Sequence, residues 1–183
     1  MSYWTDMRTP TEAELVVGMY DLTNYTAFGQ RATPLEVLDV MTRYHAFAGQ
    51  LFHAAGGILI KTAGDAGLFA FRDVDADRAV QSALELQNSG DRWLMEVDYK
   101  GRVRTVMHLG PCALGLMGGP GREMLDIMGK TVNIVGAMRT EGYLAVTPTL
   151  FRRLGAEMRT HFKKHTPPVS YIGVEDPRPR TTN

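Results

Sequence analysis

The chain has 183 residues, of which 44% are hydrophobic and 22% charged, and its 20 basic side chains balance its 20 acidic ones. That length suits one compact domain with its own core. A formal net charge of zero argues against a nucleic-acid partner, because such binders pair many basic side chains with phosphates. The single cysteine, Cys112, cannot form an internal disulfide, which fits a reducing compartment.

Neither a membrane segment nor a signal peptide is visible. No stretch approaches the roughly 20 apolar residues of a membrane-spanning helix, and the N-terminus lacks a basic region followed by an apolar run. We therefore expect a soluble, cytoplasmic protein. Composition predicts an N-terminal segment over residues 1–13, one domain over 14–175 and a loose Pro/Arg/Thr tail over 176–183.

The first elements follow from local signals. Residues 15–20 form a short apolar run with β-branched valines, which favours a buried strand ending at Asp21. A helix follows, because Thr33 is a good N-cap, Pro34 suits the first helical position and Glu36 completes a capping box. Its apolar residues recur mostly at three- and four-residue intervals and comprise Leu35, Leu38, Met41, Ala48, Leu51 and Phe52.

The middle of the chain predicts two hairpins and a helix. Residues 58–63 and 68–71 flank a glycine-rich turn and read as the first hairpin, and a helix is expected over 75–87. Residues 103–107 and 113–117 read as a second hairpin with Gly110 and Pro111 in its turn.

The last third of the chain again alternates between predicted helices and strands. We expect a short helix near 132–138, a strand near 144–146, a helix over 148–154 and a strand near 169–174. Alternating helices and strands predict an α/β or α+β sandwich.

Two aspartates stand out by position. Asp21 ends the first strand, and Asp65 lies in the turn of the first hairpin. If those strands are neighbours, the two carboxylates converge, and such a pair suits Mg²⁺, which prefers oxygen ligands. The alternative is that Asp65 is an ordinary turn residue and Asp21 only a strand terminator.

Four segments resemble the motifs of class III nucleotidyl cyclases. Residues 20–26 (YDLTNYT) are similar to the first metal segment of that family, and residues 57–66 (GILIKTAGDA) are similar to the second. Residues 108–118 (HLGPCALGLMG) resemble its central glycine-rich segment, and residues 125–133 (LDIMGKTVN) resemble its substrate segment. The motifs occur in the family's order, and the resemblance extends over residues 16–174.

The resemblance implies an α+β fold with a ferredoxin-like βαββαβ core, a sheet faced by helices, and residues 14–175 as the catalytic domain. It also implies a head-to-tail homodimer with sites between the subunits. In the family the ribose 3′-hydroxyl attacks the α-phosphate, giving a 3′,5′-cyclic nucleotide and pyrophosphate with two ions, Mg²⁺ or Mn²⁺. By matching position, Asp21 and Asp65 hold both ions, assisted by the Leu22 carbonyl.

The resemblance places Lys61 and Asp126 at the two base-reading positions. A lysine can donate to N1 of adenine and an aspartate can accept from its N6 amino group. Guanine reverses that pattern, and a guanylate cyclase more often has glutamate and cysteine here, so we expect ATP as substrate. The alternative is that Lys61 is a strand lysine reaching solvent and Asp126 a loop carboxylate.

Two further residues are carried over by position. Asn133 matches the asparagine that orients the ribose, or else it caps the short helix that follows. Lys163, in the sequence FKKHTPPV, is the best match to the basic residue that holds the triphosphate. Its neighbour Lys164 is a weaker match, and two adjacent lysines can also be a solvated pair.

The sequence departs from the family after Asn133. The family places a transition-state arginine four residues further on, where this chain has Ala137. Arg139 is the nearest basic residue, and we expect either that it takes over the role of the transition-state arginine or that this arginine is absent.

The main hypothesis is a signalling adenylate cyclase. The alternatives are a degenerate domain that binds nucleotide or a partner, and a guanylate cyclase. Methionines beside the motifs, Met117 and Met124 among them, suit either an adaptable dimer interface or plain packing.

Overall fold

The computed structural model describes residues 3–4, 9–138, 143–166 and 169–174. Its strands are β1 (Thr11–Leu22), β2 (Ile58–Ala63), β3 (Ala66–Arg72), β4 (Val103–Met117), β5 (Met124–Met128), β6 (Leu144–Val146), β7 (Phe162–His165) and β8 (Ser170–Gly173). Its helices are α1 (Tyr25–Arg31), α2 (Pro34–Ala54), α3 (Ala76–Glu96), α4 (Lys130–Ala137), α5 (Pro148–Arg153) and α6 (Ala156–Arg159), with a 3₁₀ turn at Asp73–Asp75.

The strands form one sheet in the order β2-β3-β1-β4-β6-β8-β7, with β5 paired to β4 off this path. The succession β1, α2, β2, β3, α3, β4 and the order β2-β3-β1-β4 constitute the expected ferredoxin-like βαββαβ core. The β1–β3, β1–β4 and β2–β3 pairs are all antiparallel, whereas β6 runs parallel to β4.

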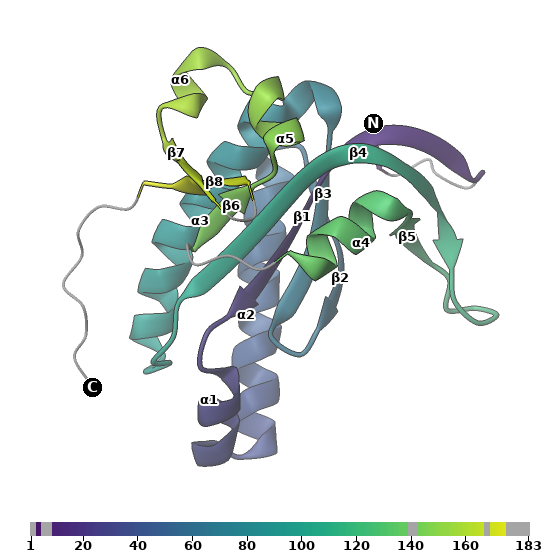
Figure 1. The fold of residues 1–183 in the computed structure, drawn as a ribbon. Helices are drawn as coiled ribbons and strands as arrows, with labels where there is room; N and C mark the ends of the chain where they lie inside the picture. Colours follow the sequence, from purple (N-terminus) through teal and green to yellow (C-terminus); the bar gives the residue numbers. More distant parts are fainter. Residues whose placement is uncertain (1–2, 5–8, 139–142, 167–168, 175–183) are drawn as a thin grey trace.

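Alternate residues of β1 serve two hydrophobic clusters on opposite faces of the sheet. Val16 and Tyr20 pack into the larger cluster, to which α2 and α3 contribute their buried faces. Leu15 and Val17 belong to the second cluster, together with Val135 of α4. Figure 1 shows the corresponding layers, with α2 and α3 behind the sheet and α4 in front of it. The central strands are therefore covered on both faces.

Helix α2 starts where its local signals predict. The Thr33 hydroxyl accepts from the Glu36 N–H, the Glu36 carboxylate accepts from the Thr33 N–H, and Pro34 occupies the first turn. The expected apolar face is wrong at its N-terminal end, because Leu35 and Leu38 are 78% and 62% exposed. The first turns of α2 extend beyond the core, alongside α1 (Figure 1).

The expected hairpin over 103–117 is wrong, since β4 is one continuous strand over these residues. Gly110 and Pro111 pair with Leu15 and Glu14 of β1. On its other side β4 pairs with β6 at residues 105–107 and with β5 at residues 113–117. Around Pro111 that side has no paired strand in the described part of the chain, so a missing N–H is tolerated there. The true hairpin partner of β4 is β5.

Other differences concern short or polar elements. The sequence reading missed α1, α6, β5 and β7, and it ended α3 nine residues early, at Gln87 instead of Glu96. The strand expected at 144–146 is β6, as predicted.

Trp4, within the predicted N-terminal segment, is buried and donates its indole N–H to the Gly56 carbonyl at 3.1 Å. Among the described residues, no helix is both long and apolar enough to cross a membrane.

Candidate active site

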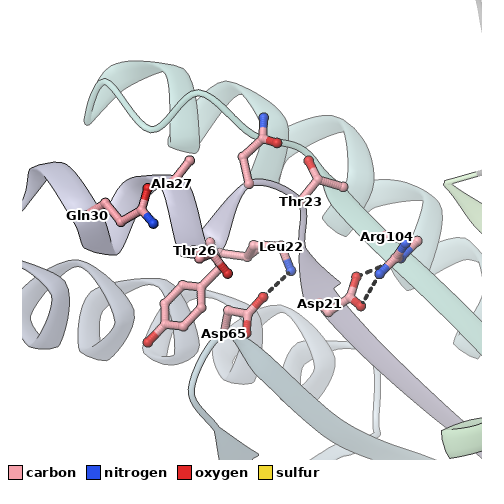
Figure 2. A pocket seen from close by; sticks show the side chains of 10 residues that line it. Asp21, Leu22, Thr23, Thr26, Ala27, Gln30, Asp65 and Arg104 are labelled. Carbon is pink, nitrogen blue, oxygen red and sulfur yellow. Dashed lines mark hydrogen bonds and ion pairs between the residues drawn. The ribbon is translucent and has the colours of Figure 1, made fainter.

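The strand order brings Asp21 and Asp65 to one end of the sheet. Asp21 is the penultimate residue of β1, and Asp65 lies in the turn between β2 and β3. Because β1 is antiparallel to β3, with Tyr20 opposite Gly67, the end of β1 lies beside that turn. The two strands are thus neighbours, which was the condition for the carboxylates to converge. Both line a cavity of about 590 Å³ formed with the start of α1 and with Arg104 of β4 (Figure 2).

The carboxylate of Asp65 points back toward β1. Its Oδ2 accepts a hydrogen bond from the Leu22 N–H at 3.1 Å, drawn as a dashed line in Figure 2. Burial raises the pKa of Asp65 above its ordinary value, and the negative charge of Asp21 adds to that effect, while the Leu22 hydrogen bond opposes it. The two carboxylates therefore repel each other, and a cation between them would relieve the repulsion.

Arg104 is a member of this site that sequence reasoning missed. It lies directly opposite Asp21 in the β1–β4 ladder. Its Nε donates to Asp21 Oδ1 at 2.9 Å, and its Nη2 donates to Asp21 Oδ2 at 2.6 Å. The hydrogen bonds that Arg104 donates to Asp21 raise the pKa of Arg104, so the guanidinium stays charged. The partners are 83 residues apart in sequence, and only the strand register joins them.

The donors in this cavity fit a hard divalent cation. The described residues contain no group of three or more His, Cys, Asp or Glu side chains suited to a metal. Two carboxylates and a backbone carbonyl leave several coordination positions to water or to phosphate oxygens, which is how proteins usually bind Mg²⁺. Asp21 and Asp65 could hold such an ion, and the Leu22 carbonyl stays a predicted ligand. A metal ion at Asp21 would have to compete with Arg104.

Lys61 and Asp126 come together at a second place. The Lys61 Nζ lies 2.7 Å from Asp126 Oδ2, and the two side chains are 47% and 12% exposed, respectively. Asp126 also accepts from the Ile127 N–H through Oδ1 at 2.8 Å. Lys61 is exposed on β2, as the alternative reading has it, but Asp126 lies in β5 and not in a loop. Their pairing joins β2 to β5, although 65 residues separate them in sequence.

Asn133 and Lys163 lie elsewhere. Asn133 is exposed within α4, whose N-cap is Gly129, so it does not cap that helix as the alternative reading supposed. Lys163 is exposed on β7, where it pairs with Ile172 of β8. Ala137 is the last residue of α4. Arg139 lies outside the described residues. Among the described residues that line the Asp21 cavity, none is Lys61, Asp126, Asn133 or Lys163.

Comparisons with known proteins give a family match and a similar curated relative. The model of the adenylate and guanylate cyclase catalytic domain matches residues 9–167. The chain is 28% identical over 130 residues to an adenylate cyclase of Anabaena cylindrica, a match that covers 67% of this chain and 26% of that protein. The chain thus spans about a quarter of the length of this curated relative.

Solved structures show the same fold at low identity. A bacterial light-regulated adenylyl cyclase superposes with a TM-score of 0.78 at 18% identity, covering 90% of this chain and 52% of that one. The guanylyl cyclase Cya2 superposes with a TM-score of 0.73 at 19% identity, covering 91% of this chain and 95% of that one. The fold is thus shared with solved adenylyl cyclases and with solved guanylyl cyclases.

Proposed function

The chain belongs to the family of adenylate and guanylate cyclase catalytic domains, and we propose that it is an adenylate cyclase that converts ATP into 3′,5′-cyclic AMP and pyrophosphate. The observation that carries the proposal is the cavity in which Asp21, Asp65 and Arg104 meet. It combines two carboxylates that can hold divalent cations with a guanidinium that can bind phosphate oxygens in a planar, forked geometry.

The residues of this cavity would act on the triphosphate. Asp21 and Asp65 would hold Mg²⁺ or Mn²⁺, two ions per site. When bound, such ions make the ribose 3′-hydroxyl easier to deprotonate and offset charge on the phosphates. Arg104 would exchange Asp21 for a phosphate oxygen, since its guanidinium can serve either anion. The Leu22 N–H would keep Asp65 oriented during that exchange.

The Lys61–Asp126 pair supports ATP over GTP. Lys61 would donate to adenine N1, and Asp126 would accept from the N6 amino group. Each side chain already holds the other at 2.7 Å, so the donor and the acceptor are preorganised before the base arrives. Guanine presents the opposite polarity, so neither the lysine nor the aspartate would find a matching group on its edge.

A homodimer would complete the site, because the base-reading pair does not line the Asp21 cavity of its own chain. The hairpin of β4 and β5 carries exposed apolar side chains suited to such an interface, namely Leu116, Met117, Met124 and Met128, which are 50%, 45%, 62% and 47% exposed. In the proposed dimer one subunit supplies Asp21 and Asp65, and its partner supplies the base readers and Asn133.

Three roles rest on sequence position alone. Asn133 would orient the ribose, and Lys163 would bind the triphosphate. Arg139 would stabilise charge at the α-phosphate in place of the arginine that is absent at Ala137.

Ala137 also supports a second candidate function, a degenerate cyclase domain that binds nucleotide without efficient turnover. Loss of a transition-state cation typically reduces rate by orders of magnitude while leaving binding in place.

The deciding experiment measures cyclic nucleotide formed by the purified chain from ATP and from GTP, each with Mg²⁺ and with Mn²⁺. We expect cyclic AMP, and we expect Asp21→Ala and Asp65→Ala to abolish it. Asp39→Ala is the matched control, since Asp39 is an exposed carboxylate of α2 paired with Arg43. Nucleotide binding without any product would favour the degenerate domain, and cyclic GMP alone would favour a guanylate cyclase.

Mixing two inactive variants tests the shared site. A heterodimer of Asp21→Ala and Lys61→Ala chains has one site with both defects and one intact site. Random mixing makes half of the dimers mixed, so about a quarter of wild-type activity should return. If each chain held a complete site by itself, mixing would restore nothing.

A further inference from the structure

His45 joins the two segments that carry the carboxylates. It lies on α2, partly buried, and both of its ring nitrogens are engaged. Nδ1 lies 2.7 Å from the Tyr20 hydroxyl, and Nε2 lies 2.8 Å from the Gly64 carbonyl. Tyr20 immediately precedes Asp21, and Gly64 immediately precedes Asp65. The His45 imidazole thus links Tyr20 to Gly64, the two residues that immediately precede the two aspartates.

The direction of both hydrogen bonds follows from the groups involved. A carbonyl oxygen can only accept, so Nε2 carries a proton and donates to Gly64. In the neutral ring Nδ1 then accepts from the Tyr20 hydroxyl. The Tyr20 hydroxyl, which can donate as well as accept, is the donor of this pair in that tautomer. The three groups therefore form a directed chain from Tyr20 through His45 to Gly64.

The two ends of this hydrogen-bonded chain differ in how firmly they are held. The Tyr20 side chain is fully buried, and its ring lies 6.2 Å from that of Phe52 in α2, centroid to centroid. Gly64 has a left-handed backbone, with φ of 61°, a conformation that glycine adopts without strain. The carbonyl of this turn residue would be free to reorient without a donor on α2. His45 supplies that donor.

We propose that His45 is a positioning residue that sets the spacing of the Asp21 and Asp65 carboxylates for cation binding. The inference rests on the proposed function only in taking these two aspartates as the metal ligands. Hydrogen-bonded partners behind metal ligands commonly change metal affinity or activity by about 10–100-fold when removed. His45 lies one residue further back than such partners usually do, because it acts through the backbone of Tyr20 and Gly64.

The test measures Mn²⁺ bound to the purified chain by electron paramagnetic resonance, with 3′-deoxy-ATP present because this analogue lacks the nucleophilic hydroxyl. We expect His45→Ala to raise the Mn²⁺ dissociation constant about tenfold, the lower end of that range, because His45 acts through the backbone. His45→Gln should recover most of the affinity, since its amide nitrogen can reach the Gly64 carbonyl as Nε2 does. His45→Asn should not recover it, because its shorter amide reaches only as far as Nδ1.

The matched control is His53→Ala, an exposed histidine near the end of the same helix, which should bind Mn²⁺ as the wild type does. Unfolding temperatures of all four variants separate lost positioning from lost folding, and the contrast between Gln and Asn is one that a purely structural role would not produce. Unchanged affinity in His45→Ala, or a wild-type chain that binds no Mn²⁺, would overturn the inference. If wild type binds Mn²⁺ through Asp65 yet makes no cyclic nucleotide, the proposed activity fails and the positioning role stands on the binding data.

Discussion

Arg104 and Asp21 face each other across the β1–β4 ladder and are joined by two hydrogen bonds of 2.9 and 2.6 Å. Both oxygens of Asp21 are thereby occupied by a cation that belongs to the chain. Arg104 consequently plays two opposing parts in the proposed reaction. It competes with a metal for Asp21 before substrate arrives, and it is available to the phosphates once a metal has taken its place.

That relationship predicts opposite effects of Arg104→Gln on two measurements. Without nucleotide, Mn²⁺ should bind more tightly than to wild type, because the competing guanidinium is gone. With ATP, kcat/KM should fall about 10–100-fold, since a charged phosphate contact is lost. Calorimetric metal titration and steady-state kinetics check the two arms. Arg43→Gln, which removes an exposed arginine of α2, is the control, and a parallel loss of metal and nucleotide affinity would contradict the competition.

Asp65→Asn should stabilise the protein while abolishing its activity. The pKa of Asp65 is raised from its ordinary value of 3.8, chiefly by burial, so the native state holds that proton more tightly than the unfolded chain does. The free energy of unfolding then decreases as pH rises above 3.8, and the whole loss is present above the raised pKa. The variant avoids this loss.

Unfolding temperatures measured with a chelator present check this prediction across pH. At pH 7 the variant should melt a few degrees above wild type, and the difference should shrink as pH falls toward the ordinary carboxyl pKa. Added Mg²⁺ should stabilise wild type and leave the variant unchanged. If the variant melts below wild type at pH 7, the charged Asp65 carboxylate does not destabilise the folded state, and the prediction is wrong.

The proposed base-reading role of Lys61 and Asp126 predicts a change of substrate when the two residues are replaced. Lys61→Glu combined with Asp126→Cys reverses the donor and acceptor pattern, so the ratio of kcat/KM for ATP to that for GTP should fall at least about tenfold. Lys61→Glu alone should lose activity with both substrates, because it places two carboxylates side by side where Nζ and Oδ2 now lie 2.7 Å apart. An unchanged ATP preference in the double variant would remove the proposed base-reading role.

Gly67 should not tolerate a larger residue. A Cβ there would lie 2.4 Å from Cζ of the Tyr20 ring, and that ring is fully buried with its hydroxyl bonded to His45. Gly67→Ala should cost about 1–3 kcal/mol of stability through overpacking, read as a lower midpoint in urea. In a Tyr20→Ala background Gly67→Ala should cost less, because the ring that its Cβ would meet is gone.

Gly119→Ala is the control, because nothing lies within 4 Å of a Cβ at that position. If Gly67→Ala unfolds at the wild-type urea concentration, the Tyr20 ring can shift and the close packing between β1 and β3 is not a constraint.

Local chemistry made part of the fold predictable. The capping box at Thr33 and Glu36 marks the start of α2, because the hydrogen bonds of a cap join residues three apart in sequence. The same local reasoning failed at Gly110 and Pro111, whose turn propensity is overridden by pairing with β1. A tertiary contact outweighs a weak local preference when it satisfies backbone groups on both strands.

The sequence by itself determined the family, through four motifs in order, and with it the expected positions of Asp21, Asp65, Lys61 and Asp126. Only the tertiary structure decided which side chains meet. Arg104 reaches Asp21, and His45 reaches Tyr20 and Gly64, because strand register and the packing of α2 set those distances. A motif records which residue types occur along the chain, whereas a hydrogen bond depends on distances that the chain acquires only by folding.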